Sequence, residues 1–401
     1  MEHKAPTACI KSNGCISNLL DGTRLEHLAG EAGYRLVKDL KSADLIILNT
    51  CAFNQLKEEE AVGLIERAQK DKMRAARIVV CGCLPAINAE RLARIHDGVI
   101  FGPRDLSGLF QLFRNRVAIP PDFSAPISYY QYSPLKKLIY QSKRLIQFIP
   151  WLNRVSMIDR LLSSLFIYSK DVFCLKVETG CWGNCAYCAI PFAKGRTKSR
   201  PLDEIKVEFD RAIDEGYAKF VLVGDEISSY GCDLPEELNI LDVIGKLIER
   251  ERLNTLFLES FEPSFMISNF DGTLGLLGSR KIPVFCSSVQ SGSNRILRTM
   301  NRQYQIEDYI SCINVIKKEY PDIHLRTEII VGFPGETEAE FKESLDLVTY
   351  LNFDFVHVYE YQDRPNTAAS KMPHKIPDRE KRNRRKRILK QHRKNLLFKR
   401  R

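Results

Sequence analysis

The sequence lacks any apolar run that approaches the ~20 residues needed to cross a lipid bilayer, so no membrane-spanning helix is expected. Its first residues, MEHKAPTACIKSNGC, lack the charged region and apolar stretch of a secretory signal peptide. We therefore expect a cytoplasmic protein. In such a reducing compartment the 12 cysteines argue against a disulfide framework and for metal or redox chemistry.

The last part of the chain has few acidic residues and many basic ones. Residues 371–401 contain 15 Lys and Arg against 2 Asp and Glu, a net charge of +13, whereas the whole chain carries +10, which leaves −3 for the remainder. Such an asymmetry indicates either a polyanionic partner or a solvated basic helix, and both readings stay open. The 401 residues, 44% hydrophobic and 27% charged, are otherwise typical of a globular protein with two or three domains.

The first hundred residues alternate between short apolar runs and segments with helical spacing. Apolar runs closed by turn residues predict buried strands at 7–14, 43–50 and 76–82. Apolar residues at helical spacing predict helices at 19–33, 55–72 and 86–95. Strands that alternate with helices predict an α/β domain with a parallel sheet.

A cysteine follows each of the three predicted strands: Cys15, Cys51 and Cys83. Because ligands bind at the carboxyl ends of the strands in open α/β sheets, these thiols could converge on one site. The alternative is three small buried hydrophobic residues, since free cysteine is often buried. The shared position at the strand ends favours a site. Cys81 lies two residues before Cys83 on the same predicted strand, so we expect both side chains on one face, with Cys81 in the core.

Residues 126–170 differ from the rest, with many aromatic residues and 7 Lys and Arg against 1 Asp. The pattern predicts two amphipathic helices broken near Pro150. Such helices could cover a core, clamp a substrate or lie on a membrane surface, and covering a core is the most common use.

After Asp171 the alternation resumes, with six apolar runs that predict strands near 172–179, 218–224, 254–260, 281–289, 323–332 and 353–361. Six βα units indicate a partial parallel (β/α)6 barrel with function at the carboxyl ends of its strands. We expect four parts in all: an N-terminal domain at 1–105, a helical linker or insertion at 106–170, the barrel at 171–372 and a basic helical tail at 373–401.

The loop after the first barrel strand reads CWGNCAYC and places Cys181, Cys185 and Cys188 at the spacing C-x3-C-x2-C. A closed zinc site usually takes four protein ligands. Iron–sulfur cubanes take one cysteine per iron, so three cysteines leave one iron of a [4Fe–4S] cluster open to an exogenous molecule. The other five cysteines lack ligand spacing, and we expect them to be structural: Cys9, Cys174, Cys232, Cys286 and Cys312.

This spacing resembles that of the radical S-adenosylmethionine superfamily, in which the open iron binds the methionine part of the cofactor. Three longer stretches resemble its methylthiotransferase branch: CLKVETGCWGNCAYCAIPFAKGRTKSRP, VQSGSNRILRTMNRQY and TEIIVGFPGETEAEF. NGC at 13–15, ADLIILNTC at 43–51 and GC at 82–83 resemble the N-terminal domain of that branch. The resemblance covers about residues 7–105 and 171–372.

The resemblance implies an enzyme that inserts a methylthio group at an unactivated C–H bond. It implies two [4Fe–4S] clusters, each with one open iron: an auxiliary cluster held by Cys15, Cys51 and Cys83, and a radical-generating cluster held by the loop cysteines. One S-adenosylmethionine would methylate a sulfur on the auxiliary cluster, and a second would be cleaved at the other cluster. An electron donor such as flavodoxin or ferredoxin is implied as a partner.

For S-adenosylmethionine itself, the resemblance implies that Tyr187 lies near the adenine. Asp225, in VGDE, would bind the methionine amine from a strand end. The turn from Gly332 to Glu336, GFPGE, would line the adenine side through backbone groups, although a Gly-Pro-Gly turn is most often only a turn.

Four further residues are candidates for contacts with cofactor or substrate. Gln290 and Ser291, in QSGS, would reach the ribose. Arg196 and Arg200 follow the cluster loop and would pair with a carboxylate of cofactor or substrate, although surface arginines need no such role.

Two features depart from the family and concern the substrate. Members typically continue into a small β-barrel domain that grips RNA, whereas this sequence shows a basic segment without strand pattern after Pro377. CSSV also precedes the QSG motif where His-x-Pro-Leu is usual. The favoured substrate is a tRNA adenosine near the anticodon, with the tail contacting phosphates. The alternatives are a peptide, a protein side chain or a small metabolite, and a non-enzymatic iron–sulfur or RNA-binding protein.

Overall fold

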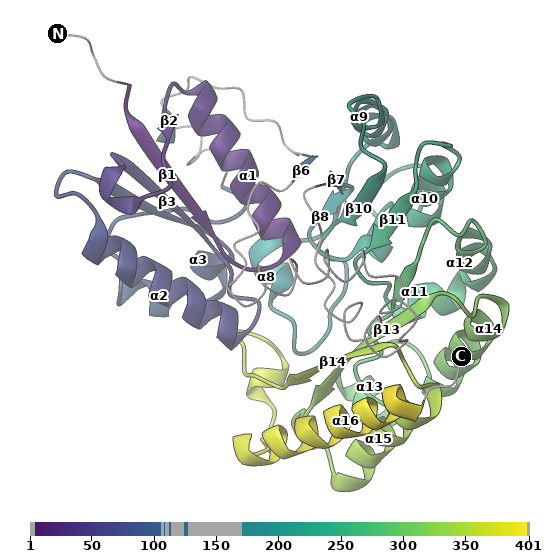
Figure 1. Cartoon of the computed structure of the whole chain (residues 1–401). Coiled ribbons are helices and arrows are strands. Elements are labelled where there is room, and N and C mark those ends of the chain that lie inside the picture. Colours follow the sequence, from purple (N-terminus) through teal and green to yellow (C-terminus); the bar gives the residue numbers. More distant parts are fainter. Residues whose placement is uncertain (1–4, 106–107, 109–111, 114–123, 127–170, 399–401) are drawn as a thin grey trace.

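The computed structural model describes residues 5–105, 108, 112–113, 124–126 and 171–398. These residues form two regions with parallel sheets, an N-terminal region and a larger C-terminal one, that lie side by side (Figure 1). The helices predicted within 126–170 lie outside the described residues, so that prediction stays open.

The N-terminal region is a five-stranded parallel sheet with the order β2-β1-β3-β4-β5. Its strands are β1 (Thr7–Ser12), β2 (Arg35–Leu36), β3 (Leu45–Thr50), β4 (Arg77–Gly82) and β5 (Val99–Ile100). The predicted parallel sheet is therefore confirmed. The strand order reverses at β1, because β2 lies on one side of it and β3 on the other, and such a switch point is where open α/β sheets bind ligands.

Helices cover both faces of this sheet. The helix α1 (Ile16–Glu31) packs on one face through Leu25 and Leu28. The opposite face is covered by α2 (Gln55–Asp71), α3 (Cys83–Ile87) and α4 (Ala89–Ala93). The central strands β3 and β4 are short apolar runs buried on both faces, as expected for a parallel sheet between two helical layers.

All six predicted strands occur in the C-terminal region: β7 (Val172–Lys176), β10 (Lys219–Val223), β11 (Thr255–Leu258), β12 (Val284–Cys286), β13 (His324–Val331) and β14 (Phe355–Glu360). They form two sheets, β11-β10-β7-β6 and β12-β13-β14, and a parallel bridge between Phe261 and Ser287 joins β11 to β12. Among the strands that the structure describes, only the short β6 (Ala125–Pro126) pairs antiparallel with a barrel strand. The predicted partial barrel is confirmed.

Helices on the outside of the barrel connect these strands: α9 (Leu202–Asp214), α10 (Ile240–Ile248), α11 (Pro263–Ser268), α12 (Phe270–Leu277), α13 (Asn294–Thr299), α14 (Ile306–Glu319) and α15 (Glu338–Leu351). Local sequence sets where several of them begin. In α15, Thr337 and Glu340 form a reciprocal capping box that satisfies free backbone amides of the first turn. The cluster loop has its own short elements, β8 (Glu178–Thr179), β9 (Lys198–Ser199) and α8 (Ile190–Lys194).

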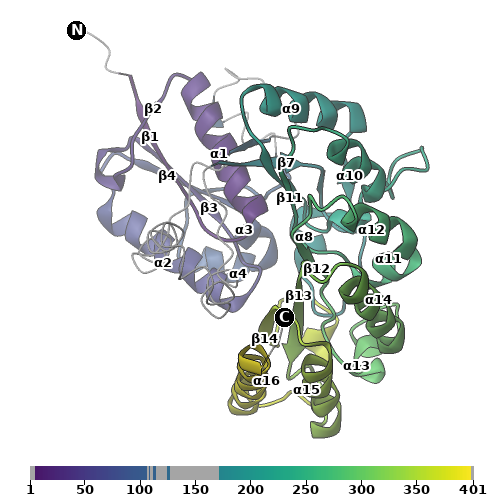
Figure 2. The ribbon, with the colours of Figure 1, turned by 45° about the vertical axis from the view of Figure 1, so that its right-hand side comes forward.

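The basic segment at the end of the chain forms the helix α16 (Asp378–Phe398), which confirms the predicted helical tail. It lies beside α15 and against β14 (Figures 1 and 2). Ile388 is fully buried in the barrel core. Arg384, also buried, pairs with Glu336 at 2.6 Å. This helix is therefore an integral layer of the barrel.

Several contacts join the two regions. Ile16 and Leu20 of α1 pack against Val172 and Val221 of the barrel sheet. The buried Glu58 on α2 pairs with Arg364, which follows β14. The helix α8 packs on α3. Among the described helices, none has the length and apolar character needed to span a bilayer.

Candidate functional site

The three N-terminal cysteines meet at the switch point of the five-stranded sheet. Cys15 is the residue before α1, Cys51 follows β3 directly, and Cys83 opens α3 after β4. A side chain at Gly14 would lie 2.3 Å from the Cβ of Cys51, so only glycine lets the turn before Cys15 approach Cys51 this closely. The thiols of Cys15 and Cys51 are hydrogen-bonded, and this bond raises the pKa of Cys15 and lowers that of Cys51.

Cys83 completes the set, and its environment separates it from Cys81. Burial raises the pKa of Cys83 to about 12, and its electrostatic neighbours include Cys15 and Lys194. The expectation that Cys81 and Cys83 share a face is wrong. Gly82 has a φ of +90°, which breaks the strand alternation. Cys81 therefore packs on the α1 face of the sheet and Cys83 on the α2 face.

The second set of cysteines lies in the loop between β8 and α8, at the carboxyl end of the first barrel strand. Neighbouring segments hold this loop through its backbone: Cys181 donates to the carbonyl of Gly195 at 3.1 Å, and Ala186 donates to that of Met300 at 2.9 Å. Gly183 lies between two of the thiols, because a side chain there would be 3.2 Å from the sulfur of Cys181 and 3.9 Å from that of Cys185.

Each of the three loop sulfurs accepts a hydrogen bond. The amide of Gly183 donates to Cys181 at 3.3 Å, and the amide of Ile190 donates to Cys188 at 3.5 Å. The buried guanidinium of Arg302 donates to Cys185 at 3.4 Å. Donors of this kind stabilise a thiolate and tune the potential of a cluster bound to it.

Both cysteine sets fit a cubane cluster better than a single metal ion. Within the described residues, no three His, Cys, Asp or Glu side chains converge closely enough to ligate one ion. A cubane does not require such convergence, because each of its cysteines binds a different iron. Burial raises the pKa of Cys181 and raises that of Cys188 to about 12. A positively charged metal would favour their thiolate forms.

Asp225 lies between the two cysteine sets. Its carboxylate accepts the amide of Gly180, at the start of the cluster loop, at 2.8 Å. It interacts electrostatically with Cys83 on the N-terminal side and with Cys188 on the barrel side. Asp225 is therefore close enough to both sets to interact with each, at the contact between the regions.

Glu226, the next residue, faces a cavity of about 440 Å³. Cys181, Cys185 and Arg302 also line this cavity. Burial, and then the neighbouring Glu262, raise the pKa of Glu226 to about 7, against the opposing effect of Arg302. Of the two acidic residues in VGDE, Glu226 therefore lines the cavity beside the cysteines. Asp225 instead bonds to the backbone at the start of the cluster loop.

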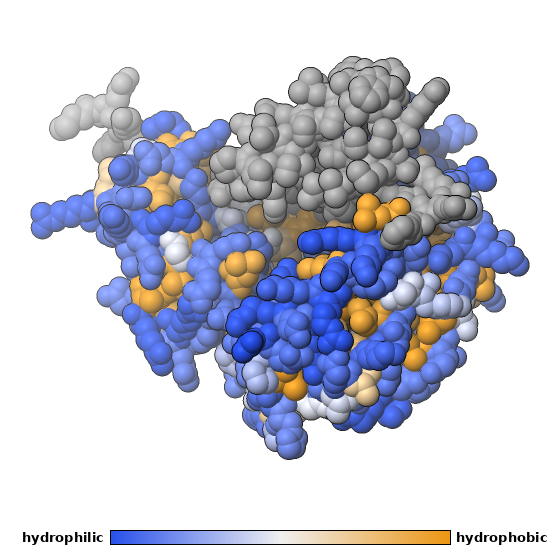
Figure 3. Space-filling model, turned by 60° about the horizontal axis from the view of Figure 1, so that its bottom comes forward, coloured by the Kyte–Doolittle hydropathy of each residue, from blue (hydrophilic) through white to orange (hydrophobic). Residues whose placement is uncertain are grey.

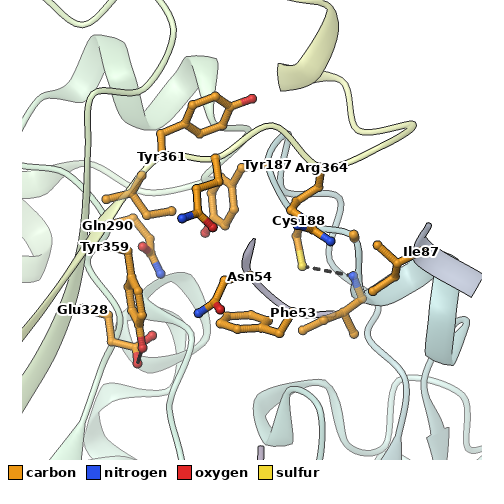
Figure 4. A pocket seen from close by; sticks show the side chains of 14 residues that line it. Phe53, Asn54, Ile87, Tyr187, Cys188, Gln290, Glu328, Tyr359, Tyr361 and Arg364 are labelled. Carbon is orange, nitrogen blue, oxygen red and sulfur yellow. Dashed lines mark hydrogen bonds between the residues drawn. The ribbon is translucent and has the colours of Figure 1, made fainter. Parts of the chain in front are cut away.

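A second, smaller cavity of about 90 Å³ opens between the two regions. Figure 4 shows Phe53 and Asn54 of the N-terminal region facing Tyr359, Glu328 and Gln290 of the barrel, with Cys188 on the opposite side from Gln290. Tyr187 and Tyr361 lie along one wall. The carboxylate of Glu328 accepts from Ser288 at 2.9 Å, and burial raises its pKa.

Four of the predicted site residues are placed away from these cavities. Ser291 is fully buried, and its hydroxyl lies 3.4 Å from that of Ser344. Glu336 accepts the amide of Gly332 at 2.7 Å and pairs with Arg384 of α16, so this turn supports the last helix. Arg200 is buried and bonds to Glu208 at 2.7 Å and to the carbonyl of Lys176 at 2.9 Å.

Arg196 supports the cluster loop from outside. Its guanidinium donates to the carbonyl of Trp182 at 2.8 Å and lies over the Trp182 ring at 5.7 Å. Arg302 and Glu226 were not predicted as site residues. Arg302 lies in the NRQY part of a recognised motif, but no spacing in the sequence relates it to Cys185, 117 residues away.

Comparison with known proteins agrees with this arrangement. Residues 175–348 match the model of the Radical SAM superfamily, and residues 7–102 match one described as Uncharacterized protein family UPF0004. A tRNA-2-methylthio-N(6)-dimethylallyladenosine synthase of Caldicellulosiruptor saccharolyticus is 31% identical over 96% of this chain and 78% of its own length. A synthase of the same name from a Thermoanaerobacter species is 28% identical over 95% of this chain and 76% of its own length.

Solved structures share the fold. The radical S-adenosylmethionine methyltransferase TsrM of Kitasatospora setae, with cobalamin and a [4Fe–4S] cluster bound, aligns with a TM-score of 0.61 at 14% identity, over 92% of this chain and 77% of that one. The cobalamin-dependent radical enzyme OxsB aligns with a TM-score of 0.54 at 15% identity, over 96% and 56% of the two chains.

The UPF0004 match contains the three N-terminal cysteines, and the Radical SAM match contains the three loop cysteines. The relative from Caldicellulosiruptor saccharolyticus aligns along nearly the whole chain. An enzyme of this kind uses S-adenosylmethionine and [4Fe–4S] clusters to insert sulfur, and the described thiols fit such clusters. The chain belongs to the radical S-adenosylmethionine methylthiotransferase family.

Proposed function

We propose that this methylthiotransferase acts on an adenosine of tRNA beside the anticodon and places the methylthio group on carbon 2 of its base. The observation that carries the proposal is the 31% identity, along 96% of this chain, to a relative named for that reaction. The cavity between the two regions supports it, because aromatic walls such as Phe53 and Tyr359 suit a planar base.

In this proposal each cysteine set holds one [4Fe–4S] cluster with an open iron. Cys15, Cys51 and Cys83 hold the auxiliary cluster, and the other cluster is held by Cys181, Cys185 and Cys188. When bound, the clusters and S-adenosylmethionine supply the radical and the sulfur. Asp225 interacts electrostatically with Cys83 of one set and Cys188 of the other, and in this proposal the substrate binds within reach of both clusters.

The larger cavity is the proposed cofactor site. Arg302 orients Cys185, and Glu226 provides a carboxylate for the methionine amine in place of Asp225. Tyr187, in the loop itself, lines the smaller cavity. Arg196 holds the loop backbone at Trp182 and is a positioning residue in this proposal.

The exposed face of α16 is the proposed contact with RNA phosphates. Five basic residues follow one side of the helix and form a basic stripe: Arg379, Arg382, Lys386, Lys390 and Arg393. Within the part of the chain that the structure describes, these five make no ion pair, whereas Arg384 and Arg387 pair with glutamates. Figure 3, which brings the lower side of Figure 1 forward, shows strongly hydrophilic residues gathered on that side. Such a stripe fits a polyanion.

Three further expectations belong to the proposal. The electron donor is a small protein such as flavodoxin or ferredoxin, and the exposed Trp182 next to Cys181 is a suitable contact for it. The enzyme works in the cytoplasm, where its substrate is found. The domain boundaries at 1–105, 106–170 and 171–372 are those expected from the sequence, but α16, which was expected to be a separate tail, belongs to the barrel.

Mass spectrometry of tRNA nucleosides from cells with and without the gene tests the substrate directly. The proposal predicts that a methylthioadenosine species disappears in the deletion strain and returns when the wild-type gene is supplied. The Cys185→Ser gene should not restore it, which ties the product to the cluster loop. An unchanged nucleoside profile would overturn the tRNA proposal in favour of a peptide, protein or metabolite substrate.

The role of the basic stripe requires substitutions rather than truncation, because removing α16 would expose the barrel core around Ile388. Replacing the five stripe residues by Gln should weaken tRNA binding and reduce its salt dependence by about 0.9 in slope per lost duplex phosphate contact. Gln substitutions at the exposed Lys206, Lys246 and Lys342, on helices outside α16, form the matched control. Equal salt slopes for the stripe variant and wild type would exclude the stripe from RNA binding.

A further inference from the structure

The small cavity between the regions has an uneven lining. Four aromatic side chains line it together with several aliphatic ones: Phe53 and Tyr359 are in edge-to-face contact at 6.4 Å, and Tyr187 and Tyr361 are also part of the lining. Gln290 and Glu328 form one end of it, away from Cys188, while Arg364 lies near Cys188 on the other side (Figure 4). A planar ring that turns a polar edge toward Gln290 and Glu328 matches this end of the lining.

Gln290 is unusual in two respects. The residue is only 7% exposed, and its buried side-chain oxygen has no hydrogen-bond partner within the described residues. Its φ is +62°, a conformation that costs a non-glycine residue free energy and is often kept at functional sites. Backbone bonds fix this conformation: Gln290 donates to the carbonyl of Glu328 at 2.8 Å and accepts from the amide of Ile330 at 2.9 Å.

A buried amide without a partner is costly unless a ligand satisfies it. A glutamine amide presents an acceptor and a donor side by side, and adenine offers the complement, its N6–H and N7. We propose that Gln290 reads the N6–H and N7 edge of an adenine ring held between the aromatic walls of this cavity, and that this ring is the substrate base. The inference rests on the proposed function and assigns the residue that selects its base.

The position of Cys188 makes the substrate the better source of this adenine. In an adenine ring, carbon 2 lies on the side opposite the N7 edge. A base read by Gln290 at one end of the cavity therefore presents carbon 2 toward the end where Cys188 lies (Figure 4). This orientation directs the reacting carbon toward the cysteine loop. The adenine of S-adenosylmethionine is the other source of the same chemistry, and the experiment must separate the two.

The test uses the full-length, cluster-reconstituted enzyme and synthetic anticodon stem–loop RNAs. One RNA carries N6-dimethylallyladenosine at the target position, and its partner carries the 7-deaza analogue, which lacks only the N7 acceptor. The wild-type enzyme should prefer the first RNA by about ten- to a hundredfold in kcat/KM, the discrimination typical of a bidentate contact. The Gln290→Leu variant should lose activity on the first RNA by a similar factor and show no preference between the two.

Two further variants keep the test decisive. Gln290→Asn tolerates a left-handed φ but carries a shorter amide, so it should fold normally and also lose the preference. Gln362 lines the same cavity, but its side-chain oxygen accepts the amide of Gln55 at 2.7 Å. Gln362→Leu should therefore retain the wild-type preference ratio whatever its effect on total activity.

The outcomes separate this inference from the proposed function. If the wild-type enzyme modifies neither RNA, the proposed function fails. If it modifies the first RNA and folded Gln290 variants keep the 7-deaza discrimination, only the reading by Gln290 is overturned. Equilibrium binding of S-adenosylmethionine is the second arm. If Gln290→Leu weakens cofactor binding tenfold or more and leaves RNA discrimination intact, the adenine belongs to the cofactor and the inference is overturned.

Discussion

The two cysteine sets offer the same number of thiols but reach their geometry by different routes. Cys181, Cys185 and Cys188 lie within eight residues of one loop, and local backbone amides bond to the sulfurs of Cys181 and Cys188. Cys15, Cys51 and Cys83 come together only because β1, β3 and β4 are neighbours in one sheet. The first set needs a correctly folded loop, whereas the second needs a correctly folded domain. The N-terminal site should therefore be the more sensitive to changes in backbone and packing.

The strongest way to separate the two sets is to remove one thiol from each. Cys185→Ser should abolish reductive cleavage of S-adenosylmethionine, because the cluster that binds the cofactor loses a ligand. Cys51→Ser should leave cofactor cleavage measurable and abolish methylthio transfer. Chromatographic detection of 5′-deoxyadenosine and of the methylthio product distinguishes the two. Loss of cofactor cleavage in both variants would contradict the division of labour.

The next largest effect concerns the contact that joins the regions. Glu58 and Arg364 are both buried, so Glu58→Gln leaves a buried guanidinium without its counter-charge and should cost about 3–5 kcal/mol of unfolding free energy. Chemical denaturation of the apoprotein measures this loss. Glu60→Gln on the exposed side of the same helix is the control, since its ion pair with Lys57 is solvent-accessible and should contribute less than about 1 kcal/mol.

The same carboxylate gives the contact a pH dependence. Burial alone would raise the pKa of Glu58, but hydrogen bonds from Arg364 and Arg91 outweigh burial and hold it below its ordinary value of 4.5. Because the pKa of Glu58 is lower in the folded protein than in the unfolded chain, its carboxylate stabilises the folded state at pH values above the unfolded pKa. This stabilisation is lost as the pH falls below about 4.5. Wild-type unfolding free energy should therefore drop more steeply than that of Glu58→Gln below this pH. If the unfolding free energies of wild type and Glu58→Gln fall in parallel with pH, the ion pair of Glu58 and Arg364 does not contribute to the pH dependence of stability.

A glycine in each region tests whether the N-terminal site is the more sensitive. Gly82→Ala would place a Cβ 2.4 Å from the carbonyl oxygen of Thr50 at a φ of +90°, so we expect a loss of at least about 1–3 kcal/mol and displacement of Cys83. Gly183→Ala meets only the Cys181 sulfur at 3.2 Å, which a small shift of the loop can relieve. Calorimetry and iron content of the two variants should differ accordingly. Equal losses of stability and iron in the two variants would show that the N-terminal site is no more sensitive than the loop site.

The smallest expected effect is at the outer support of the cluster loop. Arg196 is exposed, and its contacts with Trp182 and Asn184 lie at the surface, so Arg196→Ala should cost less than about 1 kcal/mol. If Arg196 positions the loop, the variant should also raise the KM for S-adenosylmethionine more than it lowers kcat. Arg211→Ala, an exposed arginine on α9, provides the comparison. An unchanged KM would show that Arg196 does not position the loop.

The sequence predicts the fold of both regions because the signal is local. Each barrel strand is a compact apolar run between helices, and all six predicted strands occur. The same pattern places Cys15, Cys51 and Cys83 after successive strands, from which their meeting follows once the sheet is parallel. Candidate residues that lie at strand ends or at a fixed spacing within one loop can therefore be found from the sequence.

Where a side chain points could not be predicted from these patterns. Gly82 reverses the face on which Cys83 lies, and the VGDE turn decides that Glu226 rather than Asp225 enters the cavity. Glu336 is occupied by Arg384, a partner 48 residues away on a helix that composition marks only as basic. These outcomes depend on backbone torsions and on long-range packing, which local hydrophobic patterns do not encode.

The central claim is that two sets of three cysteines each hold one cubane cluster with an open iron. Iron and sulfide content of the reconstituted enzyme tests it most directly, in wild type and in a Cys15→Ala, Cys51→Ala, Cys83→Ala triple variant. With two cubanes, wild type should contain about eight irons and eight sulfides, and the variant about four of each while still cleaving S-adenosylmethionine. About four irons in wild type, unchanged in the variant, would contradict it.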